Sequence, residues 1–75
     1  MRWIVYHDGY ENGLRGFYGV EPDGTPRKVS GHRTKKEAME VCQKLQVEAK
    51  ADAHFAWYEQ GNPGVLMPTY SVAKK

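Results

Sequence analysis

Three short runs of β-branched and aromatic residues, each followed by a turn signal, occupy the first half of the chain and constrain its fold most strongly. They have the composition of β-strands: Arg2–Asp8, Leu14–Glu21 and Pro26–His32. The clearest turn is Pro22-Asp23-Gly24-Thr25, where proline presets φ and glycine accepts a positive φ. Because short turns join neighbouring antiparallel strands, the spacing predicts a three-stranded antiparallel β-meander.

A helix is predicted directly after the third run. In Thr34-Lys35-Lys36-Glu37 the threonine hydroxyl can accept from the Glu37 amide, while the Glu37 carboxylate reaches back to the Thr34 amide, as in a capping box. Apolar residues then recur at intervals of three and four, which predicts one buried stripe: Ala38, Val41, Cys42, Leu45 and Ala49. We expect this helix to end near Lys50.

The remaining residues predict a fourth strand and a less regular end. His54–Gln60 alternates like a strand, Gly61–Gly64 forms a loop, and Val65–Val72 contains Pro68, which restricts it to an edge strand or an ordered tail. A chain of 75 residues supports one core. The sequence therefore predicts a single α+β domain over residues 1–75, in which an antiparallel sheet of three or four strands packs on one helix in the order β-β-β-α-β, with a possible extra edge strand.

Strand alternation predicts which side chains face the helix. Without a bulge, six apolar residues share that face: Trp3, Val5, Leu14, Tyr18, Val20 and Val29. The opposite face then mixes basic and aromatic residues, including Tyr6, Arg15, Phe17 and Lys28. A bulge, which the glycines Gly16, Gly19 and Gly31 permit, would exchange the two sets beyond it.

Basic residues cluster around the third strand and the helix start. This cluster holds Arg27, Lys28, Arg33, Lys35 and Lys36, with no acidic residue before Glu37. Phosphate is a candidate ligand, because a helix amino terminus also presents unpaired N–H donors. The alternative is an ordinary solvated surface, since the net charge is only +2. On the outer face, Phe17 is a candidate to stack on bases or to contact a protein.

Other chemistries have little support in the sequence. Cys42 is the only cysteine and lies on the apolar stripe, while the three histidines have no metal-ligand spacing. No constellation indicates a catalytic site, a cofactor or a small-molecule substrate. We therefore expect a non-enzymatic protein. Without an apolar run of membrane-spanning length or a signal peptide, we also expect no membrane association and a cytoplasmic location.

The order of strands, the Asp23-Gly24 turn and the helix start Thr34-Lys35-Lys36-Glu37-Ala38 resemble the arm-type amino-terminal DNA-binding domain of phage tyrosine integrases, over roughly Trp3–Leu45. In that family the exposed face of a three-stranded sheet enters the major groove. The resemblance implies contacts from Arg15, Arg27, Lys28 and Phe17.

Two functions remain open from the sequence. The first is nucleic-acid binding, with DNA the expected form, through seven residues: Arg15, Phe17, Arg27, Lys28, Arg33, Lys35 and Lys36. The second is protein interaction, either as a homodimer or as an inhibitor of a host protein, because a module of this size also looks like the small proteins that phages and mobile elements carry.

Overall fold

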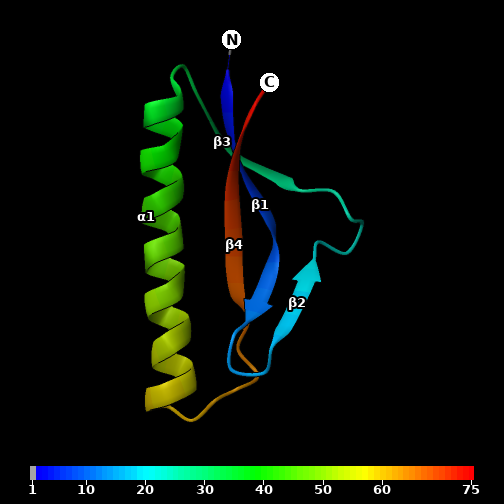
Figure 1. Cartoon of the computed structure of the whole chain (residues 1–75), viewed down its shortest axis with the longest axis vertical. Helices are drawn as coiled ribbons and strands as arrows, with labels where there is room; N and C mark the ends of the chain where they lie inside the picture. The colour runs from blue at the N-terminus through cyan, green and yellow to red at the C-terminus, as the bar shows by residue number, and fades with distance from the viewer. Residues whose placement is uncertain (1) are drawn as a thin grey trace.

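The computed structural model describes residues 2–75 as an antiparallel sheet with one long helix beside it (Figure 1). The elements are β1 (Trp3–Asn12), β2 (Phe17–Val20), β3 (Arg27–His32), α1 (Lys35–His54), a π-helical turn η1 (Phe55–Glu59) and β4 (Met67–Lys74). The α+β class and the order β-β-β-α-β are those predicted from the sequence.

β1 is the central strand of the sheet. β4 pairs with it from Trp3 to Glu11, whereas β3 pairs with Trp3–His7 and β2 with Gly9–Asn12. Because a strand has only two edges, β2 and β3 lie one after the other along the edge opposite β4. The predicted meander is therefore wrong in one respect: β3 pairs with β1 and not with β2.

Two register shifts interrupt the ladders of β1. One falls between Val5 and Tyr6 opposite β3, and the other between His7 and Gly9 opposite β4. The sequence permitted a bulge, but the glycines considered for it are not the site of either shift. Gly9, next to the second shift, allows close approach of β2, because a Cβ there would lie 2.2 Å from the Gly19 carbonyl oxygen.

The helix begins where the sequence predicts and ends later. The Thr34 hydroxyl accepts from the Glu37 amide at 3.2 Å, while the Glu37 carboxylate contacts His32 instead of returning to the cap. The predicted fourth strand at His54–Gln60 is wrong, because helical structure continues to Glu59. Alanines carry the helix through this region, and Gly61, at φ 61°, lies where it stops.

α1 packs mainly along β4 and does not reach β2 (Figure 1). The buried apolar side chains are therefore few: Ile4, Val5, Ala38, Ala53, Ala56 and Trp57. Ala38 of the predicted stripe is buried, and its other four members are half-buried. Four residues expected to face the helix are instead exposed, because within residues 2–75 the helix does not extend over β2: Leu14, Tyr18, Val20 and Val29.

The resulting molecule is thin, with principal extents of 43 × 25 × 14 Å. Within residues 2–75, no helix combines the length and apolar character needed to cross a bilayer.

Candidate functional site

Pairing of β4 with β1 brings the two ends of the chain together beside the start of α1. Trp3 is the partner of Lys74, and the Lys75 amide donates to the Arg2 carbonyl at 2.9 Å. On the other edge of β1, Trp3 is also the partner of His32, the last residue of β3. The connection to α1 follows immediately. Residues from three distant parts of the sequence thus meet at one end of the sheet.

Trp3 lies at the centre of this end. The Lys35 Nζ is 5.6 Å from the indole centroid, and the Lys74 Nζ is 5.8 Å from it. Both distances are within the range at which the negative face of an aromatic ring attracts a cation. Trp3 therefore contacts one ammonium group from the helix and one from β4.

Two more cations meet at Gly31 on β3. A Cβ at that glycine would lie 3.8 Å from a guanidinium nitrogen of Arg2 and 3.8 Å from Cε of Lys28. Lys28 therefore extends along β3 toward Arg2. We call the whole group the basic end, and it holds seven of the eleven Lys and Arg residues: Arg2, Lys28, Arg33, Lys35, Lys36, Lys74 and Lys75.

Two acidic residues of α1, Glu37 and Glu40, lie near the basic end and offset part of its charge. The nearest in sequence is Glu37, whose carboxylate lies 3.2 Å from Nδ1 of His32. Several acids lie toward the opposite end, where Trp57 approaches the β1–β2 turn: Glu11, Asp52 and Glu59. The small net charge of +2 thus conceals an uneven distribution.

The structure separates some of the predicted site residues from the rest. Arg15 lies in the β1–β2 turn and Phe17 begins β2, paired with Asn12 at the far end of β1. The nine steps from Trp3 to Asn12 span about 30 Å of extended chain. Arg15 and Phe17, although exposed, therefore do not share a surface with Lys35 and Lys36.

Arg27 forms an ion pair with a buried carboxylate, although its own side chain is 74% exposed. Its Nε lies 3.3 Å from Oε2 of Glu21, and the other carboxylate oxygen of Glu21 contacts Nδ1 of His7. The Glu21 side chain is 1% exposed. Arg27 is the partner of His7 and not of Trp3 in β1, and Glu21 offsets its charge, so only four of the seven predicted residues belong to the basic end: Lys28, Arg33, Lys35 and Lys36.

Sequence reasoning missed Arg2, Lys74 and Lys75. The signal was present in part, because Arg2 is the second residue and the last two residues are lysines. Their convergence depends on β4 pairing with β1 along its length, and Pro68 argued against a well-paired strand there. Pro68 is tolerated because β4 is an edge strand that pairs only with β1.

Residues 2–75 contain no group of three or more His, Cys, Asp or Glu side chains placed to hold a metal ion. Burial raises the pKa of the Cys42 thiol, and the nearby Asp8 carboxylate raises it further. A thiol with a raised pKa is a weak nucleophile at neutral pH.

Comparison with protein-family models, with curated proteins and with solved structures finds no match to this chain.

Proposed function

We propose that this chain is a small non-enzymatic module that binds nucleic acid, with DNA the expected ligand, through the basic end. The observation that carries the proposal is the pairing of β4 with β1, which gathers Arg2, Lys74 and Lys75 beside the helix start. Seven cations in one region give a local positive field that the net charge of the chain does not indicate.

The chemistry of the basic end suits phosphate groups. Lysine and arginine side chains neutralise phosphates and release condensed counterions, which supplies most of the affinity in sequence-independent binding. The first turn of α1 adds unpaired backbone amides and the positive end of the helix dipole. Trp3 restrains the ammonium groups of Lys35 and Lys74, which reduces the entropy lost when they contact a ligand.

Charge reversal at two sites tests the proposal. We expect Lys36→Glu with Lys75→Glu to weaken binding of labelled duplex DNA at least tenfold, since each contributes to the same positive field. Loss of two phosphate contacts also lowers the slope of log affinity against log salt by about two. Fluorescence anisotropy at low and near-physiological salt measures both effects.

A matched variant separates the basic end from total charge. Arg15→Glu with Lys44→Glu makes the same change in net charge, but both side chains lie outside the basic end and are exposed. We expect this variant to retain most of the affinity. Equal losses in the two double variants, or no binding by the wild-type protein at low salt, would contradict the proposal.

A further inference from the structure

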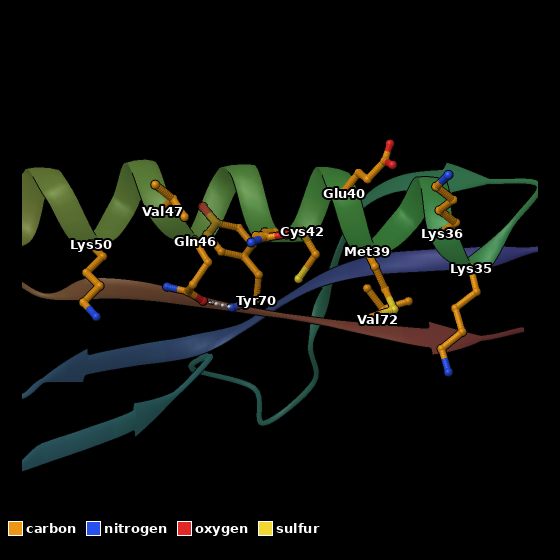
Figure 2. Close-up of a pocket in the computed structure, with 11 residues that line it drawn as sticks. Lys35, Lys36, Met39, Glu40, Cys42, Gln46, Val47, Lys50, Tyr70 and Val72 are labelled. Atoms are coloured by element: carbon orange, nitrogen blue, oxygen red, sulfur yellow. Dashed lines mark hydrogen bonds between the residues drawn. The ribbon is translucent and has the colours of Figure 1, made fainter.

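A long apolar groove lies between α1 and β4 (Figure 2). Of the residues that line it, only Lys35 and Lys36 belong to the basic end. The volume of the groove is about 1030 Å³. The walls are mainly apolar, and Met39 and Val47 on the helix are 52% and 59% exposed. Across from them, Tyr70 and Val72 of β4 complete the groove.

The strand that borders this groove has an open edge. β4 pairs only with β1, and the Tyr70 amide points away from β1 because it donates to Oε1 of Gln46 at 3.0 Å. In an antiparallel strand, alternate residues direct both backbone groups to the same edge. Val72 and Lys74 therefore present their N–H and C=O groups to the groove side.

Only one side chain of residues 2–75 forms hydrogen bonds with this edge. Gln46 donates to the Pro68 carbonyl at 3.0 Å and accepts from Tyr70, as Figure 2 shows for the second bond. The rest of the edge, from the Tyr70 carbonyl to Lys74, has no such partner. An unpaired edge beside apolar side chains is the arrangement to which an extended peptide adds as a further strand.

Charge on the rim indicates what kind of peptide fits. Lys35 and Lys36 lie at one end of the groove and Lys50 at the other, while Glu40 is the single acidic residue of the lining. The helix from Lys35 to Lys50 is about 22 Å long. That length accommodates about six or seven extended residues.

We propose that this groove binds an extended segment of a partner protein, apolar in its middle and acidic at both ends, as a strand added to β4. A second copy of the chain is a poorer occupant. Pairing of two β4 strands would bring the rim lysines of both copies, Lys35, Lys36 and Lys50, to one shared groove. Like charges at both ends would oppose that dimer.

The test uses a synthetic peptide of about ten residues, with alternating valine and threonine in the middle and two glutamates at each end. Its controls are the same peptide with lysines at the ends and the same peptide with a central proline, which cannot complete the ladder. Hydrogen exchange of the Val72 and Lys74 amides reports strand addition directly. Alkylation of Cys42, the only cysteine and a residue of the groove lining, reports occupancy.

We expect the acidic peptide to slow both amide exchange and Cys42 alkylation, and both control peptides to do so at least tenfold less effectively. Val47→Glu should abolish the effect by adding negative charge to the apolar wall, whereas Val20→Glu, on exposed β2, should not change it. Circular dichroism serves to check that both variants fold.

Three outcomes would overturn the proposal. These are no protection of Val72 by the acidic peptide, equal protection by the lysine-ended peptide, and a wild-type dimer in sedimentation equilibrium that Val47→Glu dissociates. The last outcome would assign the groove to self-association.

Discussion

Asn12 is a buried polar residue, 1% exposed, that joins two loops far apart in the sequence. Its Oδ1 accepts from the Leu14 and Arg15 amides at 3.1 and 3.2 Å. Its Nδ2 donates to the carbonyls of Pro63 and Val65. One side chain thus fixes the β1–β2 turn and the loop that leads into β4.

We expect Asn12→Ala to lower the free energy of unfolding by about 2 to 3 kcal/mol, because buried backbone groups lose their partners. Urea denaturation measures this change. Asn62→Ala is the matched control, since its exposed side chain makes only a local bond to the Gly64 amide. We expect it to cost less than about 1 kcal/mol. Equal costs would show that Asn12 does not join the two loops energetically.

Residue-level prediction from sequence succeeded for local contacts. Thr34 and Glu37 are three residues apart, so their pattern identifies the helix start without knowledge of the fold. The partners of Asn12 are 51 and 53 positions away. No local sequence pattern predicts such bonds.

At the scale of elements, Gln46 connects α1 to β4. Its amide group forms two hydrogen bonds with the strand edge, one to Pro68 and one from Tyr70. Gln46 thus pairs with the Pro68 carbonyl and the Tyr70 amide on the outer edge of β4, where Pro68 itself has no N–H to donate. This contact holds the helix beside the strand that supplies Lys74 and Lys75.

We expect Gln46→Ala to destabilise the protein by about 1 to 2 kcal/mol and to accelerate hydrogen exchange of the Tyr70 amide. Gln43→Ala is the control, because Gln43 also lines the groove but its side chain has no hydrogen bond among the described residues. It should change stability by less than about 0.5 kcal/mol. A Tyr70 amide whose exchange rate does not change would refute the role of Gln46.

The order and type of most elements followed from local composition, but their pairing did not. The third run is a strand as predicted. It pairs with β1 and not with β2, because β4 takes one edge of β1 while β2 and β3 share the other. Apolar residues occupy alternate positions over 47–57, as in a strand. Three of these six residues are alanines, which favour a helix. Periodicity over so short a window does not separate a strand from a helix end.

At the scale of the whole molecule, charge is distributed unevenly along the long axis. The basic end combines Lys28, Arg33, Lys35 and Lys36, which the sequence identified, with Arg2, Lys74 and Lys75, which only the fold brings there. Arg15 and Phe17, which the sequence also predicted as contact residues, lie toward the opposite end of β1, and Arg27 pairs with Glu21. The local sequence shows neither how far Arg15 and Phe17 lie from Lys35 nor that Arg27 pairs with a buried carboxylate.

The central claim is that nucleic acid contacts the basic end, and the most direct test is titration of ¹⁵N-labelled protein with a short DNA duplex, followed by NMR. The chain has two tryptophans, so two indole N–H signals serve as position markers. Trp3 lies among the lysines of the basic end, whereas Nε1 of Trp57 donates to the Val65 carbonyl at 2.6 Å near the opposite end. We predict shifts at Trp3, at residues 33–36 and at Lys74 and Lys75, with the Trp57 indole unchanged. Shifts confined to residues 15–20, or no shifts at low salt, would contradict the account.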